Sequence, residues 1–521
     1  MGRDGNADLA CVVGSPAMID GVFKASRRHP WETTGLVVLV ALAAWLRLRE
    51  LGLVEFKADE SAGVELARRV LAGEFPTVGL RSSVGAYNPP LFVYLMAIPL
   101  AVRDDPLAGT AFVGVLAAVA VALTFLVVRP RFGRLAALAA AGLFATAPWA
   151  VLYGRKIWAQ DLLPVVTVTL LWSMFLVLER PRSRAVMLVP VFVCLAFQLN
   201  FSALALVVPA ALLLLYRARE VHWWAFVGGL LLAVLLLAPW LGHELAHGFE
   251  DVSLLFSEGR GRGGSVVGAG SVEAIRDTFH VISAGGWSYV VGSSGPDFIR
   301  EAGSAWTLGR EAGTVAAALF VIGLVTSLVG VVRGGHLTRV YPFVELDIDK
   351  ARRALLLAWI AGIWLSYATS ATYRVLPHYM IVTYPVSFAV QGLGLSDLVS
   401  MVRGRFRFEA AVVGYGVLVA ILAGYVAFTL SFHRFLEKEG GTSGDYGVVY
   451  RDTAALARFA KDRRLRVAND EAADFLVTRV LFAPLGTAPS LTVRDRLQDP
   501  SPLPCAIEIR RFGPLAVCPS A

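Results

Sequence analysis

The chain has 521 residues, of which 56% are hydrophobic and 17% are charged, and its mean hydropathy is +0.62. Soluble globular domains usually carry about 25% charged residues, so this composition excludes a soluble domain and indicates an α-helical polytopic membrane protein. The formal net charge of +8 does not call for nucleic acid as a partner. Many Arg and Lys residues lie in short loops between apolar runs, where membrane proteins keep their cytoplasmic positive charge.

Residues 1–32 are polar, and they lack the short apolar core and small-residue exit of a cleavable signal peptide. We interpret them as a cytoplasmic tail that precedes a retained anchor. Apolar runs of about 17–25 residues can span a bilayer. Such runs lie at 35–53, 107–128, 135–152, 162–178, 222–241, 311–332, 354–372, 378–397 and 410–431.

The apolar run 185–216 is too long for one straight span. Gln198, Asn200 and Ser202 interrupt its middle, so we interpret it as two short spans that meet at the outer face. The sequence therefore predicts roughly eleven transmembrane helices within a membrane domain at 33–431.

The positions of the basic loops predict the topology. Arg residues cluster near 129–134, 180–184, 217–219, 333–353 and 403–407, and all these loops should be cytoplasmic. This arrangement puts 55–106, 153–161, 242–310, 373–378 and everything after 432 on the outer side. Residues 89–102 have an apolar core of only about 14 residues, so we expect them to lie along the membrane surface rather than to cross it.

The first outer loop, 55–106, carries the adjacent carboxylates Asp59 and Glu60 just before a predicted amphipathic helix at Ser61–Leu71. Carboxylates at a helix start cap its N–H groups, and this explains one acid better than two. The alternative is a catalytic pair, with one carboxylate as general base and the second orienting it or holding a cation.

Two other outer segments carry ionisable residues. In the first, YGRKIWAQD, Arg155 and Lys156 are candidates to clamp a phosphate, and Asp161 faces inward from the next span. In the second, YRVLPHYMIVTYP, Arg374 suits a phosphate, and His378 with Tyr379 suits a proton relay or substrate contact. Anchoring at the lipid headgroups explains both segments equally well.

His243, Glu244 and His247 form an HExxH pattern where a span leaves the membrane. On a helix this pattern places two imidazoles on one face with Glu as a general base, as in zinc proteases. The sequence shows no obvious third ligand.

The tail at 432–521 changes composition and combines a helical pattern at 451–463 with short strand-like runs. We interpret it as a small extracytoplasmic α/β domain. Cys505 and Cys518 lie close together within it. A disulfide between them and two unpaired thiols are both open interpretations.

In their order along the chain, several stretches resemble the GT-C superfamily of membrane glycosyltransferases, in the branch of bacterial protein O-mannosyltransferases and lipid A aminoarabinose transferase. The stretches are FKADESAGVELARRVLAGEFP, YNPPLFVYLMAIP, ATAPWAVLYGRKIWAQDLLP, APWLGHELAHGFED, PHYMIVTYP and GGTSGDYGVVY. The resemblance covers about 35–450 and leaves out the tail. It implies a GT-C type helical fold with interfacial helices in the first outer loop.

The resemblance also implies a reaction. Such enzymes transfer a sugar from a polyprenyl-phosphate carrier to a lipid, glycan or protein acceptor at the outer face of the membrane. The first-loop acid acts as general base in an inverting displacement, which maps onto Asp59 with Glu60 beside it. The departing phosphate needs cations, for which Arg155, Lys156 and Arg374 are candidates.

Tyr87 and Asn88 stand where the aminoarabinose branch has a phosphate-binding Lys. We expect them to contact substrate together with Asp161, His378 and Tyr379. Some relatives hold a divalent cation at the first-loop acids, and the sequence assigns no metal ligand. The expected location is the bacterial inner membrane.

Two other functions are compatible with the sequence. One is a membrane metalloprotease built on His243, Glu244 and His247. The other is a non-catalytic transporter of lipid-linked sugars, which should carry functional charge deep within its spans.

Overall fold

The computed structural model describes most of the chain. The described residues are 30–82, 85–258, 269–333, 338–340, 343–368, 375–402, 407–463, 466–467, 490–495 and 510–519. Arg374, Cys505 and nearly all of the predicted cytoplasmic tail lie outside these ranges.

Within the described residues, six helical stretches are long and apolar enough to cross a bilayer. They are α3 (Pro30–Leu48), α6 (Pro106–Phe132), η2 with α9 (Ala159–Leu162 and Leu163–Glu179), α12 (Trp223–Ala246), α17 (Ser304–Val332) and most of α20 (Arg407–Glu439). A seventh candidate is the pair η6 (Pro377–Thr383) and α19 (Val386–Val402), which is bent by 66°. The chain is thus a multi-pass membrane protein, while the count of eleven spans stays a prediction.

The remaining predicted spans coincide with shorter or more charged helices. These are α7 (Arg134–Thr146), α8 (Pro148–Tyr153), η3 with α10 (Arg184–Met187 and Leu188–Leu199), η4 with α11 (Phe201–Leu206 and Val207–Tyr216) and α18 (Ile348–Ser366). The predicted interruption of the run 185–216 lies at Asn200, where α10 ends. The Asn200 side chain accepts a hydrogen bond from the Ser202 N–H at 2.9 Å and so starts the next helical turn.

Short helices occupy the segments predicted to lie outside. They are α4 (Ala58–Leu71), α5 (Leu91–Val102), α13 (Glu250–Glu258), α14 (Ala269–Val281), α15 (Ser288–Val291), η5 (Gly292–Ser294), α16 (Gly295–Ala302) and α21 (Tyr450–Asp462). The short η1 (Leu51–Leu53) lies at the end of the first predicted span, 35–53. At 12 residues, or about 18 Å, α5 is shorter than the hydrocarbon core of a bilayer.

Six short strands complete the described elements. β1 (Thr338–Val340) and β2 (Phe343–Glu345) form an antiparallel hairpin. In the tail, β3 (Arg466–Val467), β4 (Ser490–Asp495), β5 (Arg510–Phe512) and β6 (Leu515–Pro519) form a sheet in the order β3-β4-β6-β5. Only the β3–β4 pair is parallel.

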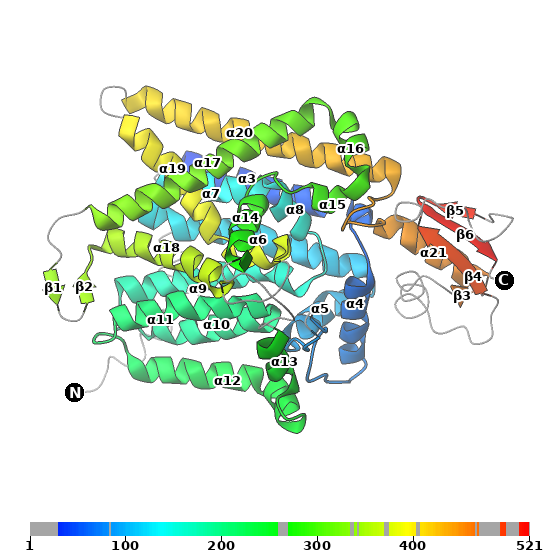
Figure 1. The fold of residues 1–521 in the computed structure, drawn as a ribbon, viewed down its shortest axis with the longest axis horizontal. Coiled ribbons are helices and arrows are strands. Elements are labelled where there is room, and N and C mark those ends of the chain that lie inside the picture. Colours follow the sequence, from blue (N-terminus) through cyan, green and yellow to red (C-terminus); the bar gives the residue numbers. More distant parts are fainter. Residues whose placement is uncertain are drawn as a thin grey trace.

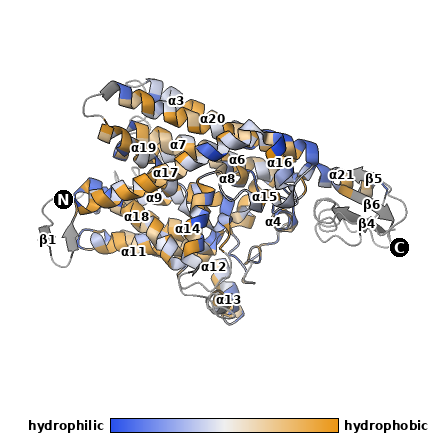
Figure 2. Ribbon diagram, turned by 45° about the horizontal axis from the view of Figure 1, so that its top comes forward, coloured by the Kyte–Doolittle hydropathy of each residue, from blue (hydrophilic) through white to orange (hydrophobic). Residues whose placement is uncertain are grey.

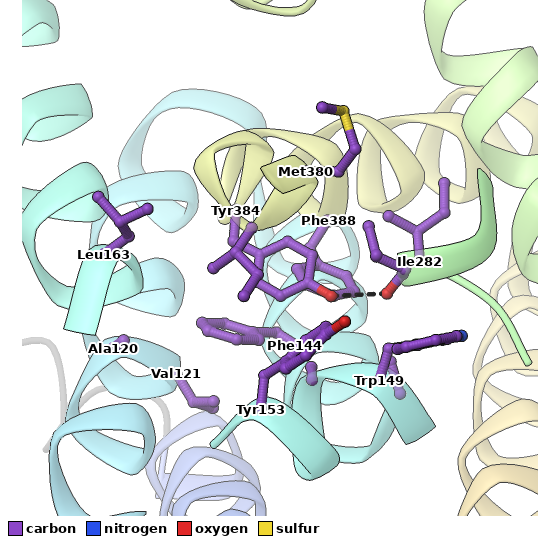
Figure 3. Close-up of a cluster of buried hydrophobic side chains, with 14 of the residues drawn as sticks. Ala120, Val121, Phe144, Trp149, Tyr153, Leu163, Ile282, Met380, Tyr384 and Phe388 are labelled. Carbon is purple, nitrogen blue, oxygen red and sulfur yellow. Dashed lines mark hydrogen bonds between the residues drawn. The ribbon is translucent and has the colours of Figure 1, made fainter. Parts of the chain in front are cut away.

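Helices α7, α17 and α19 pack closely because small residues let their backbones approach. A Cβ at Gly392 would lie 2.2 Å from the Ala136 carbonyl oxygen, and one at Gly323 would lie 2.0 Å from that of Val390. Aromatic rings fill the neighbouring core (Figure 3), where Phe144 stacks on Phe388 at a centroid distance of 5.0 Å.

Several of the segments predicted to be outside lie at one end of the molecule. Figure 1 shows α4, α5, α15, α16 and α21 at the end that carries the tail sheet, and the β1–β2 hairpin at the opposite end. Apolar residues cover the helices between these ends (Figure 2). The topology derived from the basic loops, including which end faces outward, stays a prediction.

Candidate active site

The two acids of the first outer loop have different environments. Helix α4 begins at Ala58, and the Glu60 carboxylate accepts a hydrogen bond from the Lys57 N–H at 2.8 Å, as an N-terminal cap does. Glu60 is fully buried, whereas Asp59 is exposed. Capping therefore accounts for Glu60 and leaves the Asp59 carboxylate at the surface of the site.

Lys156 neutralises a buried pair of carboxylates. Its ammonium group contacts the Glu55 carboxylate directly and lies 3.2 Å from Glu60 Oε1. All three side chains are buried. Burial disfavours the charged form of Lys156 and so lowers its pKa. The attraction of Glu55 and Glu60 for the ammonium is stronger than this effect, so the pKa of Lys156 is raised. Burial also raises the pKa of Glu55 to about 7, against the opposing effect of Lys156.

Trp158 joins these charges to Asp59. Its indole N–H donates to Asp59 Oδ2 at 3.1 Å, and the Lys156 ammonium lies 3.3 Å from the centroid of its ring. The Trp158 and His378 rings pack in a T-shaped arrangement, with their centroids 4.7 Å apart. Desolvation and then repulsion from Glu60 raise the pKa of Asp59, while Lys156 and the Trp158 hydrogen bond oppose that shift.

Two buried arginines fasten the end of α3 to the segment 144–156. Arg155 donates to the carbonyl oxygens of Leu46 and Glu50 at 3.0 and 2.9 Å. In the opposite direction, Arg47 at the end of α3 donates to the carbonyl oxygens of Phe144, Ala145 and Ala150 at 2.8–3.1 Å. We call this arrangement the reciprocal arginine clamp. It sets Lys156 against the acids, and it directs the Arg155 guanidinium into the protein.

The other predicted site residues fall into two groups. Asp161 and His378 are buried near Lys156, whose charge acts on both; neither Asp161 oxygen nor His378 Nδ1 has a hydrogen-bond partner within the described residues. The Tyr379 ring lies 4.3 Å from that of His378. Tyr87 and Asn88 instead shape the loop, since Tyr87 N–H donates to Asp251 and the Asn88 amide to the Leu80 carbonyl.

The segment 440–450 packs against the start of the first outer loop and the residues just before it. Tyr450 N–H donates to the Val54 carbonyl at 2.8 Å, and the Tyr446 hydroxyl donates to that of Leu53 at 2.5 Å. The Asp445 carboxylate lies 3.7 Å from the Lys57 ammonium. Sequence reasoning missed Glu55, Trp158 and Asp445 as members of the site.

The HExxH pattern does not form the zinc-protease arrangement in the described residues. The His247 ring stacks on that of His243 at 4.0 Å, and its Nδ1 lies 2.8 Å from the His243 carbonyl oxygen. Glu244 is buried, and one of its carboxylate oxygens lies within 4.8 Å of an oxygen of Asp251.

Residues 87–243 match the model of the dolichyl-phosphate-mannose-protein mannosyltransferase family. This match confirms the resemblance stated from the sequence, although it covers under half of the chain and begins after Asp59.

The solved structure of ArnT shares the fold at low sequence identity. ArnT from Cupriavidus metallidurans, bound to undecaprenyl phosphate, matches with a TM-score of 0.55 and 13% identity over 94% of this chain and 98% of ArnT. The archaeal oligosaccharyltransferase AglB from Archaeoglobus fulgidus was solved in complex with an inhibitory peptide and a dolichol-phosphate. It gives a TM-score of 0.47 at 13% identity, over 87% of this chain and 60% of AglB. A comparison with curated protein sequences gives no match.

Proposed function

We propose that this protein is a glycosyltransferase that moves a sugar from a polyprenyl-phosphate carrier to a lipid, glycan or protein acceptor at the outer face of the bacterial inner membrane. The observation that carries the proposal is the environment of Asp59. Its carboxylate is exposed at the end of the molecule predicted to lie outside, is oriented by Trp158 and has a raised pKa. An accessible carboxylate whose pKa lies above its ordinary value suits the role of a general base.

The reaction balances with one proton transfer and one displacement. Asp59 takes the proton from an acceptor hydroxyl or amine as the acceptor atom bonds to the anomeric carbon. The bond from that carbon to the carrier phosphate breaks on the opposite face, and the phosphate leaves as an anion. Glu60 positions Asp59 through the start of α4 and does not itself accept the proton.

The cations take different roles in this proposal. Lys156 and Arg155 are paired within the protein, so they act on a donor phosphate through their charge rather than through free N–H groups. Arg374 follows α18 and precedes η6, and we propose that it contacts the phosphate. Asp161, His378 and Tyr379 would line the donor side, with Tyr87 and Asn88 shaping the loop that borders it.

The test is transfer by the full-length protein in detergent or liposomes. Mass spectrometry of lipid that co-purifies with the protein should identify a polyprenyl phosphate or its sugar conjugate, which then serves as the labelled donor. Recovery of a polyprenyl carrier with label transferred to an acceptor supports the proposal. A protein that neither retains such a lipid nor transfers sugar from any such donor contradicts it.

Replacement of Trp158 should change the pH dependence of transfer. The Trp158 indole stabilises the ionised form of Asp59, so Trp158→Phe should raise the Asp59 pKa. The acidic limb of kcat/KM should then move to higher pH by about one unit, the value of a hydrogen bond to a charged group. A pH profile of Trp158→Phe that coincides with the wild type would show that this hydrogen bond does not act on the base.

A further inference from the structure

A second cluster of buried acids lies away from the Asp59 site, where α12 ends and α13 begins. Gly248 and Phe249 both have positive φ angles, 65° and 62°, and Phe249 N–H donates to the Glu244 carbonyl at 2.8 Å. A positive φ is unfavourable for a bulky residue such as Phe249. This sharp turn folds α13 back, so that Asp251 comes to lie beside His243 and Glu244.

Three ligand atoms converge there. One nitrogen of His243 and one carboxylate oxygen each of Glu244 and Asp251 all lie within 4.8 Å of one another. His243 Nε2 is 3.7 Å from Asp251 Oδ2. Ligand atoms about 2.1 Å from a tetrahedral zinc ion lie about 3.4 Å apart, so small side-chain rotations would complete such a site.

One carboxylate oxygen each of Glu244 and Asp251 is available to bind a ligand. The second oxygen of each carboxylate is used, because Glu244 Oε2 accepts from Val252 N–H at 3.2 Å and Asp251 Oδ1 from Tyr87 N–H at 3.0 Å. The remaining oxygens, Glu244 Oε1 and Asp251 Oδ2, are buried and have no hydrogen-bond partner within the described residues. The two side chains are only 1% and 5% exposed.

The charge balance favours a cation. Two adjacent carboxylates removed from water are costly unless they are paired or coordinate a metal. In the described part of the chain, no Lys or Arg forms an ion pair with either carboxylate, and His243 supplies a nitrogen that Mg²⁺ and Ca²⁺ do not favour. We propose that His243, Glu244 and Asp251 bind a divalent transition-metal ion such as Zn²⁺, with water in the fourth position.

The position of this site suggests what the ion does. Asp251 holds the backbone of Tyr87 in the first outer loop, and the Trp240 indole donates to the Tyr87 carbonyl at 3.1 Å. The ion would fix Asp251 and so join that loop to the end of α12. This role is structural and does not depend on the proposed transfer reaction.

The experiment uses the full-length protein in detergent, stripped with a chelator and then titrated with Zn²⁺. We expect one zinc ion per chain by metal analysis and a higher unfolding temperature with zinc. Glu244→Gln and Asp251→Asn should each weaken zinc binding by at least about tenfold. The matched controls His247→Gln and Glu250→Gln, which replace exposed neighbours outside the cluster, should bind zinc like the wild type.

Cobalt gives a readout that does not need the variants to fold. Co²⁺ added to the stripped wild type should show the intense visible absorption of a four-coordinate nitrogen and oxygen site, and Zn²⁺ should abolish that absorption. Stripped wild type that takes up neither ion overturns the proposal, since the two acids would then share a proton. Equal loss of zinc in His247→Gln and Asp251→Asn would also overturn it, because the ligands would then be the two histidines.

Discussion

Asp59→Asn should lower sugar transfer by about 10²–10⁴-fold, the usual contribution of a general base. The amide keeps the size of the side chain and can still receive the Trp158 hydrogen bond, but it cannot take a proton from the acceptor. Initial rates with the labelled polyprenyl donor measure the loss. The stability of the folded protein should hardly change, because Asp59 is exposed and caps no helix.

Asp104→Asn is the matched control for this variant. Asp104 belongs to the same predicted outer loop, but its side chain is 66% exposed and pairs with Arg68. We expect transfer within about twofold of the wild type, since surface ion pairs contribute little. Full activity of Asp59→Asn with its true donor would remove Asp59 from the chemistry. Equal losses in both variants would mean that the loop tolerates no change of charge.

Lys156→Met should destabilise the protein by about 3–5 kcal/mol, the cost of breaking a buried ion pair from one side. The substitution leaves Glu55 and Glu60 buried without their shared cation, and it removes the attraction that opposes the rise in the pKa of Glu55. Thermal unfolding in detergent should show a clear fall in midpoint at neutral pH. The fall should shrink at pH 5, where protonation removes the unpaired charge.

Two further variants make this result specific. Lys57→Met removes a cation that is 34% exposed beside the same Glu55 and should cost only about 0–1 kcal/mol. Lys156→Met combined with Glu55→Gln should recover part of the lost stability, because one buried charge disappears with its partner. A double variant less stable than Lys156→Met alone would contradict the assignment of Lys156 as counter-ion to Glu55.

Apolar run length predicted the membrane class, and apolar helices lie at the predicted spans, although several of them begin or end six to eight residues away from the expected bounds. The sequence also predicted the break at Asn200, because three polar residues in the middle of an apolar run are incompatible with a single continuous span. Span number was harder to predict. The bend between η6 and α19, and the short lengths of α10 and α11, depend on packing against neighbours and not on local composition.

The site was only partly accessible to sequence reasoning. Adjacent acids after the first span drew attention to Asp59 and Glu60, but the sequence could not say which one caps α4. Lys156 was interpreted as a phosphate ligand because its two partners lie about 100 residues earlier in the chain. Trp158 stood inside the stretch already singled out, yet an aromatic residue at a span's edge is typical of interfacial anchoring.

The reciprocal arginine clamp has a consequence for how this protein can be modified or recombined. The end of α3 and the segment 144–156 each bury an arginine in the carbonyl groups of the other. A chimaera that imports only one of these segments from a relative would therefore leave buried donors or acceptors unpaired. The two segments should therefore be exchanged together if a chimaera is to keep its stability.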